Sequence, residues 1–132
     1  MIAAALTDVP GASDYFLEGC VTYSNEAKMR LLGVREETLE QHGAVSEQTA
    51  REMAEGLLAR TGADIALSVT GIAGPGGGTP EKPVGTVHLA VASKDGETTA
   101  HVLRFPGHRD FVRKIATFFA LNLLRQKVIE FL

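Results

Sequence analysis

The sequence predicts an α/β domain, a mixed layer of helices and strands. Helical and strand-like apolar patterns alternate along the chain, and an Asp-Gly hairpin signal separates the last two strand-like runs. The 132 residues are enough for one domain with a core of its own. The composition, 45% hydrophobic and 22% charged, is ordinary for a soluble globular protein. We therefore expect a single domain over residues 1–132.

The N-terminal part contains a helical fragment and a strand-like run. Residues 2–7 resemble the end of a helix, with no capping residue and no preceding turn, before Pro10-Gly11 breaks the pattern. Residues 16–23 (FLEGCVTY) are rich in β-branched and aromatic side chains and predict a strand. Because the chain begins inside a helical pattern, we expect the domain to be incomplete at its N-terminus.

Three helices are predicted next. Residues 25–32 follow Ser24, a good N-cap, and a short helical piece covers residues 36–41. The clearest helix begins after Ser46 and is closed by Gly62. Its apolar side chains share one helical stripe that faces a core: Ala50, Met53, Ala54, Leu57 and Leu58.

The second half predicts three strands and a long helix. A strand over residues 65–69 enters the glycine-rich segment, and residues 85–92 and 98–105 form a hairpin. The helix over residues 109–131 is apolar nearly all round between residues 115 and 124. Such a helix is expected to be buried on two sides, in the core or against another subunit.

Charge and composition exclude several classes of protein. The net charge of −3 argues against nucleic acid as the main partner. The longest uncharged apolar run is half of what a membrane span needs, so no membrane partner is expected. A single cysteine, Cys20, rules out an internal disulfide framework and favours a reducing compartment. We expect a soluble, cytoplasmic protein.

The segment over residues 70–85 is the main candidate for a binding loop. It holds six of the 14 glycines and three of the five prolines. Glycine permits positive φ and close approach to a ligand, and bare N–H groups in such a loop can form a nest for an anion such as phosphate. The segment matches neither the Walker A motif nor the dinucleotide fingerprint. A mobile surface connection is the alternative.

Tyr23 and Lys28 lie at a predicted strand-to-helix junction, a place where ligands often collect. A tyrosine and a lysine brought together can transfer protons, since the ammonium favours the phenolate or, if desolvated, serves as a base. The alternative is a buried tyrosine, a plain N-cap at Ser24 and a solvated lysine. The histidines are most simply exposed, and no pair has the spacing of a zinc motif, so no metal is expected.

Several of these motifs together resemble the CinA C-terminal domain family. They are residues 2–13 (IAAALTDVPGAS), Tyr-Ser-Asn-x-x-Lys at 23–28, His-Gly-Ala-Val-Ser at 42–46, the glycine-rich segment, and Phe-Pro-Gly-x-Arg at 105–109. The resemblance covers nearly the whole chain. It implies a three-layer α/β/α fold with a mixed sheet, here lacking its first helix and strand, and a homo-oligomer.

The resemblance also implies an activity. Members of the family are associated with nicotinamide-nucleotide amidohydrolase activity in pyridine nucleotide salvage, without a cofactor or metal. Tyr23 and Lys28 would belong to the catalytic group. The expected substrate-binding residues are Ser24, Asn25, Thr70, Gly71, Gly74, Pro75, Gly76, Gly77 and Arg109.

One departure from the family pattern bears on turnover. The family's serine motif precedes the segment matched by Ile2, so the expected nucleophile is absent from this sequence, and amide hydrolysis is expected to be badly impaired. The alternatives are a non-catalytic nucleotide-binding or subunit-assembly module and a scaffold for partners in DNA uptake or the damage response. Loss of a strand also predicts an exposed sheet edge and self-association.

Overall fold

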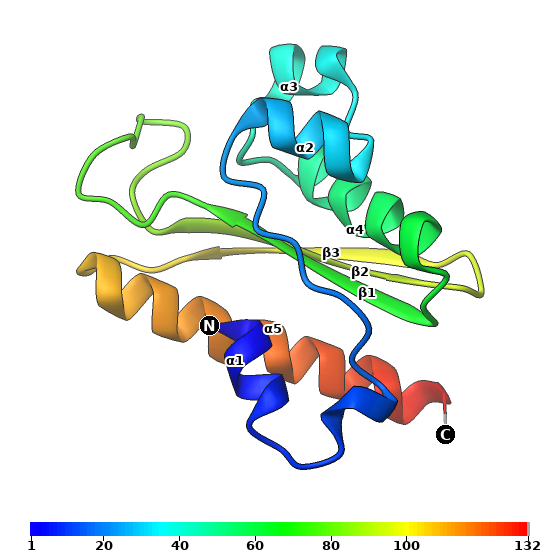
Figure 1. Cartoon of the computed structure of the whole chain (residues 1–132). Coiled ribbons are helices and arrows are strands. Elements are labelled where there is room, and N and C mark those ends of the chain that lie inside the picture. Colours follow the sequence, from blue (N-terminus) through cyan, green and yellow to red (C-terminus); the bar gives the residue numbers. More distant parts are fainter. Residues whose placement is uncertain (132) are drawn as a thin grey trace.

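A three-stranded sheet with helices on both faces forms the centre of the molecule (Figure 1). The computed structural model describes residues 1–131. In chain order the elements are α1 (Ile2–Thr7), the 3-10 turn η1 (Ala12–Asp14), α2 (Asn25–Leu32), α3 (Glu36–His42), α4 (Glu47–Thr61), β1 (Ile65–Gly71), β2 (Thr86–Ser93), β3 (Thr98–Arg104) and α5 (Arg109–Phe131).

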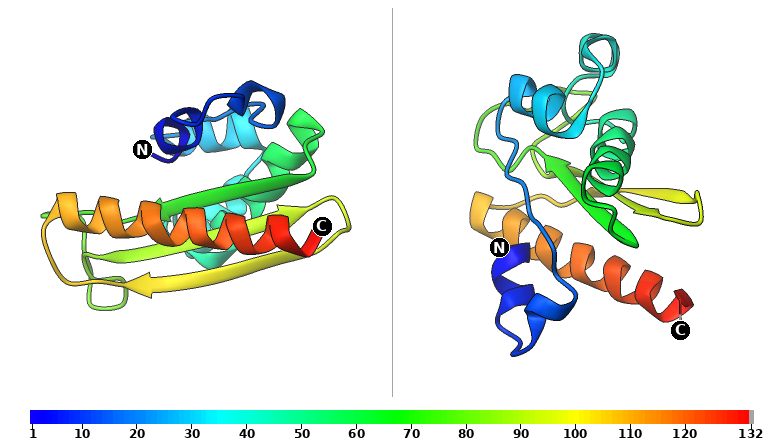
Figure 2. Two further views of the ribbon diagram at one scale, coloured as in Figure 1. Left: turned by 90° about the horizontal axis from the view of Figure 1, so that it is seen from below. Right: turned by 45° about the vertical axis from the view of Figure 1, so that its right-hand side comes forward.

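Helices α4 and α5 lie on opposite faces of the sheet (Figure 2). Alternate side chains of a strand point to opposite faces, so Ala90 packs with the alanines of α4 while Leu89 packs with Val112 of α5. Small residues on the α4 side let that helix lie close to the sheet. The α/β class and the helix–sheet–helix layering are confirmed.

The strand order is β1-β2-β3, and both pairings are antiparallel. Leu89 in the central strand lies opposite Val69 of β1 and His101 of β3. Within residues 1–131 the sheet is therefore antiparallel throughout, whereas a mixed sheet was expected. The difference arises because each strand pairs with the next one along the chain through a loop rather than a crossover helix, and such connections make antiparallel pairs.

Residues 16–23 are not a strand, so that prediction is wrong. The backbone of this segment is irregular, and the side chains of Val21 and Leu17 are 88% and 61% exposed. Figures 1 and 2 show it passing from the α5 layer to the α4 layer on the open side of β1. β-propensity reflects packing on paired neighbouring strands, and this segment pairs with no strand of the sheet.

Helix α5 is covered by the sheet on one face. Val112, Ala116 and Ala120 are buried there, while Phe118 on the outer face is 64% exposed. Burial on two sides is therefore not seen within residues 1–131, and the alternative of a subunit contact stays a prediction. None of the helices in this range, α5 included, has the length and apolar character needed to cross a membrane.

Candidate active site

The glycine-rich loop between β1 and β2 is tied down at its base. Ile72 N–H donates to the Thr86 carbonyl at 2.9 Å, and Gly85 N–H donates to the Ile72 carbonyl at 2.7 Å. Farther along the loop, the Lys82 ammonium donates to the carbonyl of His42, the last residue of α3. These anchors favour the prediction of a positioned loop over that of a mobile connection.

The tip of this loop presents unused donors. Gly74 and Gly77 have φ values of 84° and 91°, which a residue with a side chain adopts only with strain. The N–H groups of Gly76, Gly77 and Gly78 make no hydrogen bond to any residue in the range 1–131. Backbone donors that are free and held in a loop are suited to an anion.

Arg109 joins the loop to Tyr23. As the first residue of α5, it donates from Nη1 to the Gly74 carbonyl at 3.0 Å and from Nη2 to the Tyr23 hydroxyl at 3.4 Å. Three segments far apart in sequence thus meet at one guanidinium. Tyr23 is 85% exposed, so the alternative of a buried tyrosine is wrong. The phenol is open to a ligand on its remaining sides.

Lys28 is buried, which contradicts the alternative of a solvated lysine. It is 7% exposed on the first turns of α2, and its Nζ donates to the Thr22 carbonyl at 2.7 Å. Desolvation lowers the pKa of its ammonium below the ordinary value. No hydrogen bond joins Lys28 to the Tyr23 hydroxyl; Lys28 instead contacts the carbonyl of the peptide bond that precedes Tyr23.

The two other polar residues of the Tyr-Ser-Asn-x-x-Lys motif, Ser24 and Asn25, lie at the N-terminus of α2. The Ser24 hydroxyl accepts from Ala27 N–H at 3.0 Å, so the expected N-cap is confirmed. Asn25 is the exposed first residue of α2. Both lie beside Tyr23 in sequence, but within residues 1–131 their side chains make no hydrogen bond to the glycine-rich loop or to Arg109.

Thr70 and Gly71 close β1 in different ways. The Thr70 hydroxyl donates to the Ala44 carbonyl at 2.8 Å and so ties the strand end to the turn before α4. At Gly71, an added Cβ would lie 2.9 Å from a Val87 methyl carbon, so β2 passes closely there. Pro75 follows Gly74 through a cis peptide bond, and Gly76 is exposed. Because its hydroxyl is bonded to Ala44, Thr70 supports the site by holding the end of β1 in place.

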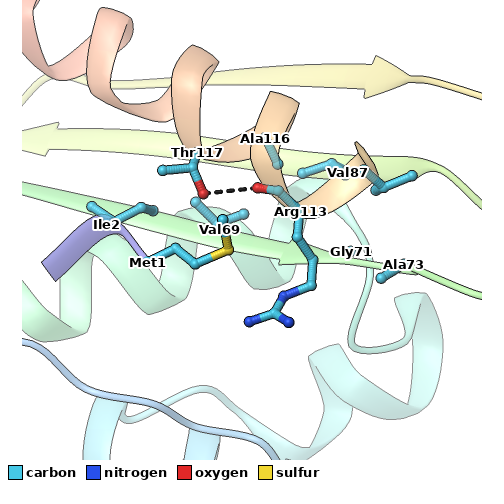
Figure 3. A pocket seen from close by; sticks show the side chains of 10 residues that line it. Met1, Ile2, Val69, Gly71, Ala73, Val87, Arg113, Ala116 and Thr117 are labelled. Atoms are coloured by element: carbon cyan, nitrogen blue, oxygen red, sulfur yellow. Dashed lines mark hydrogen bonds between the residues drawn. The ribbon is translucent and has the colours of Figure 1, made fainter. Parts of the chain in front are cut away.

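A pocket that the sequence did not reveal adjoins this group. It has a volume of about 240 Å³ and lies between the end of β1, α1 and the first turns of α5 (Figure 3). Its lining includes Val69, Gly71, Ala73, Val87, Val112, Arg113, Ala116 and Thr117. In the sequence, the valines and alanines of this lining cannot be distinguished from ordinary core residues. Arg113 lies one helical turn after Arg109, and this second arginine is the residue from which a site here could have been predicted.

The histidines contribute no metal site. His101 is exposed on β3, and His88 is half-buried on β2, where burial lowers its pKa. Across residues 1–131, no three side chains of the metal-binding types lie together in a way that could hold an ion.

Comparisons with known proteins point to one family. The family model described as "CinA C-terminal domain" matches residues 1–128. The "Putative competence-damage inducible protein" of Caldicellulosiruptor bescii is 53% identical over 131 residues, which are 99% of this chain and 32% of that protein. A "CinA-like protein" of Chlorobaculum tepidum is 62% identical over 112 residues, 83% of this chain and 26% of that protein. The chain thus spans about a third or less of the length of these relatives.

Solved structures agree with the fold. The competence/damage inducible protein CihA from Agrobacterium tumefaciens superposes with a TM-score of 0.92 at 48% identity, covering 95% of this chain and 76% of that one. A CinA superfamily protein from Escherichia coli gives a TM-score of 0.90 at 38% identity, covering 95% of this chain and 72% of that one.

Proposed function

The chain belongs to the CinA C-terminal domain family, and on that premise we propose that its site binds nicotinamide mononucleotide and serves the hydrolysis of the carboxamide, giving nicotinate mononucleotide and ammonia. The observation that supports this proposal most is the meeting of Tyr23, the Gly74 carbonyl and Arg109 beside a buried lysine. The reaction would belong to pyridine nucleotide salvage in the cytoplasm.

The loop would bind the phosphate of the nucleotide. The free N–H groups of Gly76 and Gly77 supply donors, and the guanidinium of Arg109 supplies charge at the adjoining Gly74. Arg109 uses one of its nitrogen atoms to hold the loop, so the same side chain would position the donors and attract the anion.

Lys28 would act first as the general base and then as the general acid. Desolvation shifts Lys28 toward its neutral amine, which can accept a proton as a water molecule attacks the carboxamide carbon and then pass it to the amide nitrogen, so that the C–N bond breaks and ammonia leaves. Tyr23, whose hydroxyl contacts the positively charged Arg109, would donate to the oxygen of the carboxamide as charge develops there. Ser24 would not act as the nucleophile, because its hydroxyl caps α2.

A second candidate function follows from that observation. Because the serine in this group of residues is engaged as a cap, the domain could bind the nucleotide without hydrolysing it, or assemble with further copies of itself. Binding and turnover therefore have to be measured separately.

Calorimetry and an ammonia-release assay with nicotinamide mononucleotide test both candidates. We expect binding that falls at least tenfold in Arg109→Gln, because one charge-assisted contact is lost. Arg125→Gln is the matched control, since Arg125 lies on the same helix and among residues 1–131 its side chain makes hydrogen bonds to Asn122 alone. Binding without ammonia release supports the non-catalytic nucleotide-binding module, and absence of binding contradicts both functions that need the nucleotide and leaves only self-assembly.

A further inference from the structure

The segment over residues 42–46, the end of α3 and the turn before α4, connects three parts of the molecule. Consecutive carbonyl groups of this segment accept hydrogen bonds from side chains of different elements. The donors are Lys82 to His42, Thr49 to Gly43 at 2.7 Å, and Thr70 to Ala44 at 2.8 Å. The segment therefore joins the glycine-rich loop, helix α4 and the end of β1, although the proposed function gives it no part.

Lys82 links this segment to the outer part of the loop, residues 75–82. Among residues 1–131, its bond to the His42 carbonyl is the only hydrogen bond that leaves this outer part. Lys82 is itself held within the loop: Thr79 N–H donates to its carbonyl at 2.9 Å, and its own N–H donates to the Thr79 hydroxyl at 3.0 Å. A cation suits the acceptor, because the carbonyls at the end of a helix carry the negative end of its dipole.

Gly43 leaves room for the Lys82 ammonium. Its φ is 80°, which a residue with a side chain adopts only with strain. A Cβ added to Gly43 would lie 3.2 Å from the Lys82 Nζ, so the ammonium would be displaced from its place beside the His42 carbonyl. A glycine at this position therefore serves the approach of Lys82 as well as the turn.

We propose that Lys82 is a positioning residue of the glycine-rich loop, and that its bond to the His42 carbonyl holds the outer part of the loop against the end of α3. The free N–H groups of Gly76 and Gly77 then keep fixed directions. The base of the loop does not depend on this bond, because Ile72 and Gly85 have backbone bonds of their own. That the held donors bind a phosphate rests on the proposed function, whereas the ordering of the loop does not.

Nitrogen-15 relaxation in the ligand-free chain tests the ordering, since 132 residues suit heteronuclear NMR. In the wild-type chain we expect the amides of Gly76 and Gly77 to have order parameters above about 0.6, the upper bound of flexible backbone. Lys82→Met keeps the side-chain length but removes the donor, so these values should fall below about 0.6 while those of Ile72 and Gly85 stay unchanged. Lys82→Arg should preserve the order, because a guanidinium can donate to the same carbonyl.

Two further variants separate the bond from the charge. Lys94→Met removes an equal charge from the β2–β3 hairpin, where Lys94 pairs with Asp64 at 2.6 Å, and should leave the loop ordered. Gly43→Ala keeps the Lys82 charge and should loosen the loop as Lys82→Met does. Added to Lys82→Met, it should loosen the loop no further, because both changes break the same bond. Circular dichroism and thermal melting verify that each variant is folded.

Calorimetry with nicotinamide mononucleotide measures the consequence for the site. We expect binding about fivefold weaker in Lys82→Met, because a loop that must be ordered on binding costs about the net worth of one hydrogen bond. Gly43→Ala should lose affinity to a similar degree, although it keeps the charge.

Unchanged order parameters of Gly76 and Gly77 in Lys82→Met would overturn the proposal. So would a flexible loop in the wild-type chain, equal loosening by Lys94→Met, or further loosening when Gly43→Ala is added to Lys82→Met. An ordered loop that depends on Lys82 in a chain that does not bind the nucleotide contradicts the proposed function alone. Nucleotide binding with a loop that is equally ordered in Lys82→Met contradicts the role of Lys82 alone.

Discussion

Replacing Gly85 by alanine should open the base of the glycine-rich loop. Gly85 has a φ of 94°, and an added Cβ would lie 1.8 Å from the Phe105 carbonyl oxygen. The same residue donates to the Ile72 carbonyl at 2.7 Å and accepts from Phe105 N–H at 3.0 Å. The new methyl group cannot be placed without moving the backbone at the point where the loop is tied to both neighbouring segments.

The expected loss of stability has two parts. A side chain at positive φ costs about 1–2 kcal/mol. Moving the backbone away from Phe105 weakens two hydrogen bonds, whose net worth is about 1 kcal/mol each. Together these predict a decrease of about 3–4 kcal/mol in the free energy of unfolding, a large share of the ~5–15 kcal/mol typical of a domain.

Gly62→Ala is the matched control. Gly62 ends α4 with a φ of 70°, and nothing lies within 4 Å of its added Cβ. This variant therefore carries only the conformational cost, about 1–2 kcal/mol. Urea denaturation followed by circular dichroism measures both variants, and calorimetry measures their affinity for nicotinamide mononucleotide. If the two variants are destabilised equally, the contact of the added Cβ with Phe105 does not contribute to the loss of stability. If Gly85→Ala keeps its affinity for the nucleotide, the base of the loop has no role in binding.

Three further predictions concern the parts around the loop. Desolvation lowers the pKa of Lys28 in the folded state, so the unfolded chain binds more protons at a pH between the lowered pKa and the pKa of the unfolded chain. As the pH rises through this range, the free energy of unfolding of the wild-type chain should therefore increase relative to that of Lys28→Met. Denaturation measurements whose pH dependence is the same for the two proteins would contradict this. Thr70→Val should lower stability by about 1–2 kcal/mol by removing the bond to Ala44, with nucleotide affinity unchanged if Thr70 acts from behind the site; denaturation and calorimetry separate the two effects. The open side of β1 and the exposed Val21 predict concentration-dependent self-association, which Val21→Lys should reduce in sedimentation velocity experiments; a wild-type chain that stays monomeric at all concentrations would contradict it.

Local signals in the sequence identified most elements. Ser24 and Ser46 cap their helices as predicted, because a side-chain oxygen next to free N–H groups acts within one turn of chain. The hairpin over β2 and β3 was predicted for a similar reason: its Asp-Gly turn specifies the connection by itself. The strand over residues 16–23 was predicted wrongly, since a strand depends on a neighbour that local composition does not supply.

The candidate site was predicted in part. The glycine-rich segment, Tyr23 and Arg109 are joined by hydrogen bonds in the structure. Because the tyrosine is exposed and Lys28 is buried, the alternatives of a buried tyrosine and a solvated lysine are excluded. The sequence suggested Tyr23 and Lys28 as a contacting pair, but their polar atoms have different partners. The pocket at Arg113 could not be predicted, because its walls come from apolar residues of separate elements.

The sequence alone determined the class of fold, the caps, the hairpin and the family motifs, because each depends on residues a few positions apart. Only the tertiary structure decided which of those residues meet. It placed Arg109 between Tyr23 and Gly74, across 86 and 35 positions of chain, and it buried Lys28. Contacts of that range depend on how the sheet, α2 and α5 pack together, and hydrophobic packing is non-directional, so no local pattern specifies them.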